Sequence, residues 1–420
     1  MRASAESAPT ARPSAAETPD YPFTLWCVMV TCGLMPLYVV RWHYGPLPTT
    51  LLETGILVTV AAFVVESWRH HVVPEWRTPY TVPAALFIVA GLIAIVVAPD
   101  RRAALGLYRA YILEPAAFFV VVSMAVRSWR QARWVLVGLA TAGLIVSIPN
   151  GFVVVQAIRH HTLNLAVTPP VVIYQTSNAV ALFLIPLIAV AASMVVYTID
   201  RMERRLALVF LVIALGAALL SFSRGGFLAM SVIAVLLALS HPRRLWLVPG
   251  TLLVAAAISR VPPVASRIGH EINLADPNNT LEARFRLWGA TLRMLRDHPI
   301  FGTGLSGFRT SIDPYRNGVF TEDLIYPHNI VLNFWTETGL LGLAAFAWLL
   351  VQAFRVAWTG WRAGDGRWRP LQLGVLLALV GMVVHGLVDV PYWKNDLSLE
   401  FWVLLALSWA GRHVVRLAAD

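Results

Sequence analysis

An arginine in the middle of the sequence has a setting that suits anion chemistry beside a membrane. Arg224 lies in the segment SFSRGGF, between two apolar runs that leave only a few residues for a turn. An arginine so close to hydrocarbon is costly, and such residues usually line a pathway or bind an anion. The serines and glycines beside it favour a close approach of the backbone to an oxyanion. The alternative is a side chain that only extends to the interface to keep its charge in water.

A histidine near the start of a long apolar run is a candidate base. His328 lies in YPHNIVLNFWTETGLLG, directly after Pro327. A helix amino terminus here would disfavour a positive imidazole, so the ring would stay neutral and could accept a proton. The same terminus would attract phosphate. A histidine that merely caps the helix is the alternative. One face of the predicted helix carries Asn329, Asn333 and Glu337. Polar side chains in a membrane helix must meet protein or water, so hydrogen bonds to a neighbouring helix are expected for this face.

Two further groups of polar residues could support a site. In HGLVDVPYWKND, His385 and Asp389 are four residues apart on one face of a predicted helix, and Lys394 follows. The pair could orient an imidazole or bind a sugar hydroxyl, or it could be a local hydrogen bond that closes the helix. Arg109 and Glu114, near the start of an earlier apolar run, are expected to bind one another or neighbouring backbone.

Apolar runs that would position these residues recur along the whole chain. Of the 420 residues, 58% are hydrophobic and 13% are charged, whereas soluble domains carry about 25% charged residues. Runs of this length match the thickness of a bilayer, and helices satisfy their own backbone there. The fold predicted is an all-α, polytopic membrane protein of about twelve transmembrane helices. Their expected positions are about 21–40, 48–67, 80–98, 105–126, 133–156, 178–198, 205–221, 225–240, 245–260, 328–354, 371–390 and 398–415.

The distribution of arginines predicts the orientation. Alternate connections carry Arg69, Arg77, Arg127, Arg130, Arg133, Arg201, Arg204, Arg205, Arg243, Arg244, Arg355, Arg362, Arg367 and Arg369. This positive-inside pattern places both termini in the cytoplasm. Residues 1–20, rich in Ala, Ser and Pro, are expected to be a disordered cytoplasmic tail, and 416–420 a second short tail. Cys27 and Cys32 should lie on different faces of one helix, so no disulfide framework or cysteine metal site is expected.

The connection over 261–327 separates helices one to nine, in 21–260, from helices ten to twelve, in 328–415. It exceeds ordinary loop lengths, which indicates a functional or separately folded segment. A helix on the membrane surface is predicted there from the spacing of Leu281, Phe285, Trp288, Leu292 and Leu295.

Cations on the outer side are exceptions to the positive-inside pattern, and they indicate a site for something anionic. They are Arg101, Arg102, Arg109, Arg224, Arg267, Arg284, Arg286, Arg293, Arg296, Arg309, Arg316 and Lys394. The net charge is +10, and nucleic acid is one partner for such a chain. For a polytopic membrane protein, anionic lipid head groups and lipid-linked substrates are expected instead, and no nucleic acid.

Several well-known motifs are absent from the sequence. We find no phosphate loop, dinucleotide fingerprint, HExxH, GxSxG or early outer acidic pair. A reaction on a lipid-linked anion that uses neither a metal nor a cofactor is the remaining expectation.

Four motifs in this order resemble the O-antigen ligase and polymerase superfamily of bacterial inner membranes. They are SFSRGGF, ARFRLWGATLRMLRDHPIFGTGLSGF, PHNIVLNFWTETGLLG and HGLVDVPYWKND. The resemblance extends to the topology, with about twelve helices and one large, partly helical periplasmic loop late in the chain, similar to C-type glycosyltransferases. It implies transfer of a glycan from an undecaprenyl-diphosphate carrier to an acceptor hydroxyl, at the periplasmic face and without a metal.

The resemblance also implies roles for individual residues. His328 matches the proposed general base, and Arg224 and Arg284 match the arginines that hold the diphosphate, with Arg286 as a close neighbour that could replace Arg284. Supporting candidates are Asn329, His385, Asp389, Lys394, Arg101, Arg102 and Arg109. A glycosyl diphosphate already has a good leaving group. The enzyme therefore mainly needs to position the two substrates, stabilise the negative charge on the diphosphate and remove one proton from the acceptor hydroxyl. Attack opposite the diphosphate predicts inversion at the anomeric carbon.

Proteins that share these motifs use different acceptors, so the motifs alone do not identify the acceptor. A ligase that uses lipid A-core as acceptor is favoured, because the chain is compact and lacks an extra carboxyl-terminal soluble domain. A glycan polymerase and a protein O-oligosaccharyltransferase are the alternatives within the superfamily. From a different class, a transporter or flippase of an anionic lipid is less favoured, because the two halves show no matching broken helices. The sequence does not indicate an oligomeric state.

Overall fold

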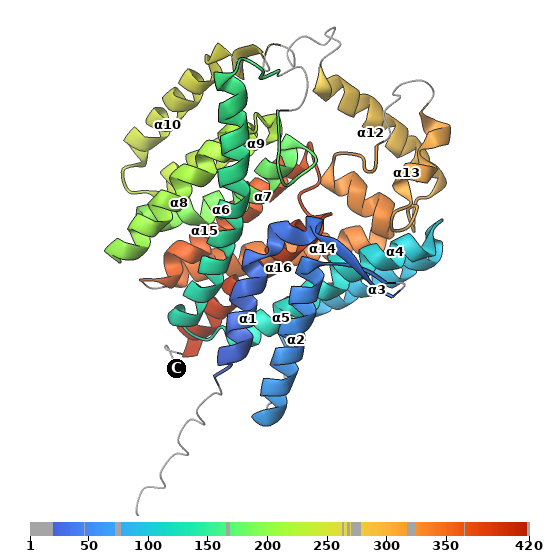
Figure 1. Cartoon of the computed structure of the whole chain (residues 1–420), viewed down its shortest axis with the longest axis horizontal. Helices are drawn as coiled ribbons and strands as arrows, with labels where there is room; N and C mark the ends of the chain where they lie inside the picture. Colours follow the sequence, from blue (N-terminus) through green and yellow to red (C-terminus); the bar gives the residue numbers. More distant parts are fainter. Residues whose placement is uncertain are drawn as a thin grey trace, which may run out of the picture.

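A computed structural model gives the structure of residues 20–45, 47–71, 77–164, 169–262, 264–266, 269, 279–316, 324–364 and 366–417. The predicted tail of residues 1–20 lies outside these ranges except for Asp20, as do Arg267 and residues 418–420. The molecule is an assembly of helices with one short hairpin, and all twelve predicted apolar runs fall on helical segments (Figure 1).

The helices in chain order are α1 (Pro22–Gly33), α2 (Leu51–Arg69), α3 (Thr81–Val97), α4 (Arg101–Tyr108), α5 (Glu114–Ala125), α6 (Trp129–Arg159), α7 (Ser177–Tyr197), α8 (Arg201–Leu220), α9 (Arg224–Ser240), α10 (Arg244–Ser259), α12 (Thr280–Asp297), α13 (Phe308–Ser311), α14 (Ile330–Ala363), α15 (Trp368–Gly386) and α16 (Asn395–Leu417). Short helical turns are η1 (Met35–Val39), η2 (Arg109–Leu113) and η3 (Asp313–Tyr315), and the hairpin consists of β1 (Arg41–Tyr44) and β2 (Leu47–Thr50).

The helices have the length and composition of membrane spans. Within the described residues, six segments are long and apolar enough to cross a membrane: 51–69, 101–125, 129–159, 177–197, 330–363 and 368–386. Four shorter helices, α1, α3, α9 and α10, are also apolar. The prediction of a helical, polytopic membrane protein is therefore confirmed, while the number of twelve crossings stays a prediction.

The core of the assembly is formed around α7. This helix packs against α15, α8, α6 and α9, and most of its side chains are buried. By contrast, α10 has no buried residue and packs against α9, at an edge of the assembly (Figure 1). Cys27 and Cys32 are both buried and carry free thiols, as expected.

The hairpin between η1 and α2 was not predicted, because the run was assigned to helices alone. Strands β1 and β2 are antiparallel, with Arg41 opposite Thr50. Thr50 then begins α2 through a capping box: its hydroxyl accepts a hydrogen bond from the backbone N–H of Glu53 at 3.1 Å, and the Glu53 carboxylate accepts one from the N–H of Thr50 at 3.1 Å. The fold is thus all-α apart from this ribbon.

A π-helical turn, η2, joins α4 to α5. It contains Arg109, whose Nη2 lies 2.6 Å from Oε2 of Glu53 and whose Nε lies 3.1 Å from Oε1 of Glu114. The expected pairing of Arg109 with Glu114 is present, and Glu53 adds a second carboxylate from α2. The guanidinium therefore holds three helical elements together.

Helix α14 is interrupted at Gly339, which has φ +68°. The loop HPIFGTG packs into this break: the N–H of Leu340 donates to the carbonyl of Ile300 at 2.9 Å, and the N–H of Thr303 to that of Thr336 at 2.7 Å. A Cβ at Gly339 would lie 2.5 Å from the Ile300 carbonyl oxygen. Glycine is needed here for both its conformation and its size.

Helix α12 is where it was predicted, but its buried face is different. Leu287 and Met294 are buried against Phe308 of α13 in a small core of their own. Phe285 and Leu292, which were predicted to share the apolar face, are 54% and 44% exposed. The face that carries Leu287 and Met294 is covered by α13, and the exposed apolar side chains are free to meet lipid, so the placement of this helix on the membrane surface stays a prediction.

Candidate functional site

The candidate base and a buried carboxylate lie together. Nδ1 of His328 is 3.4 Å from Oδ1 of Asp389. The side chain of His328 is 27% exposed, whereas that of Asp389 is 3% exposed. The histidine can therefore meet a substrate while the carboxylate behind it cannot.

His328 precedes α14 and is not part of its first turn. The helix begins at Ile330, and Oδ1 of Asn329 accepts hydrogen bonds from the N–H groups of Val331 and Leu332 at 3.0 and 3.1 Å. His328 itself has φ +49°, a left-handed conformation. The first amides of α14 are thus capped by Asn329, and the group that Nδ1 of His328 meets is the carboxylate of Asp389.

Asp389 is held as an ionised acceptor. Its Oδ2 accepts a hydrogen bond from Nδ2 of Asn178 at 3.2 Å, and its Oδ1 accepts one from the N–H of Val390 at 2.9 Å. Burial alone would raise its pKa, but the hydrogen bond from His328 and the positive charges nearby hold the pKa below its usual range. An ionised carboxylate at Nδ1 keeps the proton on that nitrogen and leaves Nε2 as the acceptor.

The predicted pairing of His385 with Asp389 on one helical face was wrong. Helix α15 ends at Gly386, so Asp389 lies beyond it and turns toward His328. His385 is buried and lies against Gly225, where a Cβ would come within 2.6 Å of Cδ2 of His385. The two motifs SFSRGGF and HGLVDVPYWKND are thus in direct contact, and glycine at 225 permits this.

Arg224 and Arg284 approach the same region from two helices. Arg224 begins α9, and its Nη1 donates to Oγ1 of Thr280, the first residue of α12, at 2.5 Å. Arg284 lies one turn further along α12, and its charge contributes to the lowered pKa of Asp389. Both guanidinium groups therefore belong to the surroundings of the His328–Asp389 pair.

Arg286 differs from Arg284 in its partner and exposure. Its Nε donates to Oε1 of Glu282 at 2.9 Å, and the two side chains form an ion pair one turn apart on α12. The Arg286 side chain is 53% exposed. Its charge is therefore largely compensated locally.

Trp288 connects α12 to the segment that carries the histidine. Its Nε1 donates to the carbonyl oxygen of Pro327 at 2.9 Å. Because Pro327 directly precedes His328, this bond fixes the backbone next to the candidate base. Asn329 adds a second tie, since its Nδ2 donates to the carbonyl of Leu387 at 3.0 Å.

A cavity of about 510 Å³ lies beside the pair. It is lined by Tyr326, whose ring centroid is 4.8 Å from that of His328. Three cations, Arg41, Arg309 and Lys394, and two polar side chains of α14, Asn333 and Glu337, also line it. The aromatic lining is Tyr38, Tyr111, Tyr174, Tyr326 and Trp393. The predicted polar stripe of α14 therefore faces a cavity.

Two groups of predicted residues lie elsewhere or have other partners. Arg101 and Arg102 are exposed at the start of α4, and Arg102 lines a neighbouring opening of about 430 Å³, which shares Leu107 and Ser306 with the main cavity. Arg109 is bound to two carboxylates, as described above. Lys394 lines the main cavity, with Nζ 5.7 Å from the centroid of the Tyr174 ring. Within the described residues, no group of three or more potential metal-ligating side chains is present.

Sequence reasoning missed Arg41, Tyr326 and Asn178. Arg41 lies in the unpredicted hairpin, so its position relative to the cavity could not be inferred. Tyr326 is in the same segment as His328, and its aromatic ring two residues before the candidate base was an available signal. Asn178 is an ordinary polar residue at the start of a helix, and nothing in the sequence indicates that it reaches Asp389.

Residues 209–347 match a protein-family model described as O-antigen ligase. The match begins within α8, includes Arg224, Arg284 and His328, and ends beyond the break of α14. No curated protein matches the chain. The family match lies on the segments that form the candidate site, and it confirms the resemblance predicted from the sequence: over these residues the chain is similar to O-antigen ligases, and its long apolar helices are those of a multi-pass membrane protein.

Proposed function

We propose that this protein is an O-antigen ligase, which transfers a glycan from undecaprenyl diphosphate to a hydroxyl of lipid A-core. The observation that carries the proposal is the contact between Nδ1 of His328 and the buried Asp389, with Arg224 and Arg284 in the same neighbourhood. This arrangement supplies one base and two permanent cations. A glycosyl diphosphate requires little more, since its leaving group is already good.

In the proposed reaction, Nε2 of His328 takes the proton from the acceptor hydroxyl. The acceptor oxygen forms a bond to the anomeric carbon while the bond from that carbon to the diphosphate oxygen breaks. Arg224 and Arg284 bind the diphosphate and stabilise the charge that develops on it, because guanidinium groups contact phosphate in a bidentate manner and stay charged. Attack from the face opposite the diphosphate inverts the anomeric configuration.

The cavity beside Tyr326 suits the sugars of the donor and the acceptor. Its aromatic lining offers apolar faces, and Asn333, Glu337 and Lys394 offer hydrogen-bonding groups at fixed positions. The three cations also favour an acceptor that carries phosphate or carboxylate groups. We place this face of the protein in the periplasm and the chain in the bacterial inner membrane, with both termini cytoplasmic.

The first experiment is transfer by the purified protein in detergent. The assay contains undecaprenyl-diphosphate-linked glycan and lipid A-core, with and without a chelator. We expect product under both conditions. We also expect His328→Ala to lower the rate by roughly a hundredfold or more, the usual contribution of a general base. The matched control is His241→Ala, which removes a histidine at the far end of α9.

Each result separates the proposal from an alternative. Near-normal transfer by His328→Ala would show that this histidine is not the base. Elongation of the carrier-linked glycan without lipid A-core would identify a polymerase. Transfer to an added protein hydroxyl in preference to lipid A-core would identify a protein O-oligosaccharyltransferase.

A further inference from the structure

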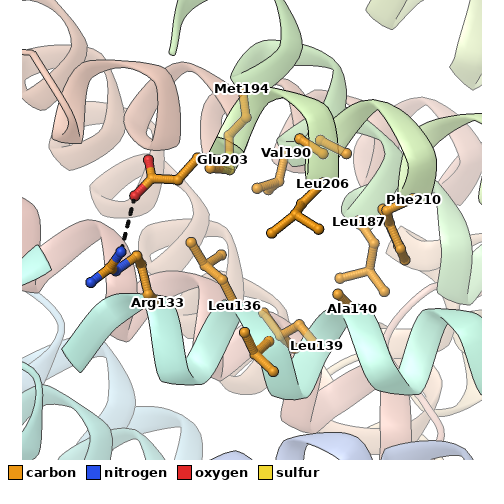
Figure 2. A pocket seen from close by; sticks show the side chains of 13 residues that line it. Arg133, Leu136, Leu139, Ala140, Leu187, Val190, Met194, Glu203, Leu206 and Phe210 are labelled. Carbon is orange, nitrogen blue, oxygen red and sulfur yellow. Dashed lines mark ion pairs between the residues drawn. The ribbon is translucent and has the colours of Figure 1, made fainter. Parts of the chain in front are cut away.

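A second cavity lies far from His328, between α6, α7 and α8. It has a volume of about 170 Å³, and its apolar lining includes Leu136, Leu139, Leu187, Val190, Leu206 and Phe210 (Figure 2). These residues belong to the beginning of α6, the second half of α7 and the beginning of α8. Asn178, which contacts Asp389, is at the opposite end of α7. The cavity is therefore near the membrane face opposite the candidate active site.

The cavity is a crevice with an apolar rim. Val137 on α6 and Leu206 on α8 both line it, and they are 56% and 63% exposed. Apolar side chains exposed on membrane-spanning helices face lipid. The crevice is thus accessible to a hydrocarbon chain from the bilayer. A dry, apolar cavity of about 150 Å³ already accommodates a molecule as large as benzene.

The crevice is polar at one end only, where Arg133 and Glu203 lie (Figure 2). Nη1 of Arg133 is 3.6 Å from Oε1 of Glu203, and the same oxygen accepts a hydrogen bond from Nε1 of Trp129 at 2.8 Å. The Arg133 side chain is 49% exposed. A guanidinium has five N–H donors, so donors remain for a further acceptor.

Glu203 has one oxygen whose hydrogen bonds are not satisfied. Among the residues that the structure describes, its buried Oε2 has no hydrogen-bond partner. That oxygen is enclosed by protein atoms, so a ligand in the crevice does not reach it and meets the half-exposed Arg133 instead. A ligand at this end should therefore carry an anionic acceptor for Arg133.

The charge around this end favours an anion. The segments 127–133 and 200–205 contain six arginines and two carboxylates, a net charge of +4. The positive charge also affects Asp200. Backbone hydrogen bonds from Glu203 and Met202 lower the pKa of this carboxyl most, and the charges of Arg367 and Arg133 lower it further. Basic residues at a membrane face attract anionic lipid head groups.

We infer that the crevice binds one molecule of an anionic glycerophospholipid, such as phosphatidylglycerol. One acyl chain lies in the crevice from Leu136 toward Phe210. The phosphate accepts hydrogen bonds from Arg133. Residues 133–140 span roughly 10 Å of helix, which matches the upper part of an acyl chain. This site is independent of the proposed transferase reaction.

The test uses the full-length protein in phosphatidylcholine nanodiscs, with a trace of lipid spin-labelled near the middle of one acyl chain. Phosphatidylglycerol, phosphatidylcholine and phosphatidylmethanol are compared as labelled probes, and the motionally restricted fraction is measured by electron paramagnetic resonance. Phosphatidylmethanol has the charge of phosphatidylglycerol on a smaller head group, so it tests whether the charge is sufficient. We expect both anionic lipids to show a larger restricted fraction than phosphatidylcholine.

Two pairs of variants test whether the motionally restricted lipid lies in the crevice. Ala207→Phe fills the crevice and should remove the restricted fraction. Val209→Phe, on the exposed side of the same helix, should leave it unchanged. Arg133→Gln should lower the preference for phosphatidylglycerol over phosphatidylcholine roughly fivefold, the effect of one basic side chain near an anionic lipid. Arg205→Gln, an exposed arginine outside the crevice, is its control.

Three results would overturn the inference. Equal restricted fractions in Ala207→Phe and Val209→Phe would show that the crevice holds no lipid. Equal restriction of phosphatidylglycerol and phosphatidylcholine would remove the role of Arg133. Displacement of the labelled lipid by undecaprenyl phosphate at a lower mole fraction than by unlabelled phosphatidylglycerol would identify a carrier lipid as the occupant.

Discussion

Asp389 decides which nitrogen of His328 is available to a substrate. Nδ1 faces the carboxylate at 3.4 Å, so Nε2 is the nitrogen left to accept a proton. The carboxylate has further hydrogen bonds from Asn178 and the backbone of Val390, which fix its own orientation. In the proposed reaction, this support orients His328 so that Nε2 acts as the base.

Asp389→Asn should lower the transfer rate by roughly a hundredfold or more, because an amide no longer fixes the tautomer of His328. It should also lower the free energy of unfolding at neutral pH. The pKa of Asp389 is below its usual range, so its stabilising contribution is present above about pH 4 and is lost only as the pH falls through the lowered pKa. We therefore expect the stability difference from the wild type to persist between pH 7 and pH 5, as measured by thermal melting in detergent.

Asp313→Asn is the matched control for this variant, because Asp313 is an exposed acid paired with Arg316. A stability difference for Asp389→Asn that disappears by pH 5 would show that the carboxylate is protonated in that range. Unchanged transfer by Asp389→Asn would remove its role as the residue that orients His328.

Arg284 and Arg286 provide a comparison within one helix. Arg284→Gln should lower kcat/KM for the lipid-linked donor by roughly tenfold to a hundredfold, since a hydrogen bond to a charged group contributes about 1.5–3 kcal/mol. Arg286→Gln should change it less than about threefold, because its charge is already paired with Glu282. Initial rates at varied donor concentration measure both. Equal losses in the two variants would refute the assignment of the diphosphate contact to Arg284.

At the scale of elements, the break in α14 gives the motif HPIFGTG a structural role. The loop HPIFGTG fills the space at Gly339, and the N–H of Ser306 beyond it donates to the carboxylate of Glu337 at 2.6 Å. The first part of α14 carries Asn333 and Glu337 to the cavity, while the second part continues as a long apolar helix. The motif therefore positions the cavity wall without contacting His328.

Gly339→Ala should destabilise the protein by about 1–3 kcal/mol, because alanine is strained at φ +68° and its Cβ would meet the Ile300 carbonyl. The measurement is the melting temperature of the purified protein in detergent. Gly250→Ala in α10 is the control, since no atom lies within 4 Å of a Cβ there and alanine favours the helix. A melting temperature of Gly339→Ala equal to that of the control would show that the break does not depend on glycine.

At the scale of the whole molecule, local patterns predicted the helices but not their meeting points. The apolar runs gave every helical segment of the membrane part, because each run reflects its own hydrophobic surface. The motifs also indicated that Arg224, Arg284 and His328 belong together. The partner of Asp389 was left open, since its contact with His328 depends on where α15 ends and joins residues 61 positions apart.

The buried face of α12 and the hairpin were missed for a related reason. The face of α12 is chosen by α13, which lies later in the chain and carries no strong pattern of its own. The hairpin is only four residues on each strand and interrupts an apolar region. The crevice is a space between α6, α7 and α8, and no pattern in a single sequence indicates such a space.

The position of Asp389 near the end of the chain has a consequence during synthesis of the protein. A ribosome makes His328 before Asp389, and Asn178, Arg224 and Arg284 before both. During translation the candidate base therefore stays without its carboxylate until the segment after α15 has left the translocation machinery and packed. An incompletely synthesised chain can therefore insert most of its helices and still lack the His328–Asp389 contact, so the proposed transfer of glycan would begin only when nearly the whole protein has been assembled.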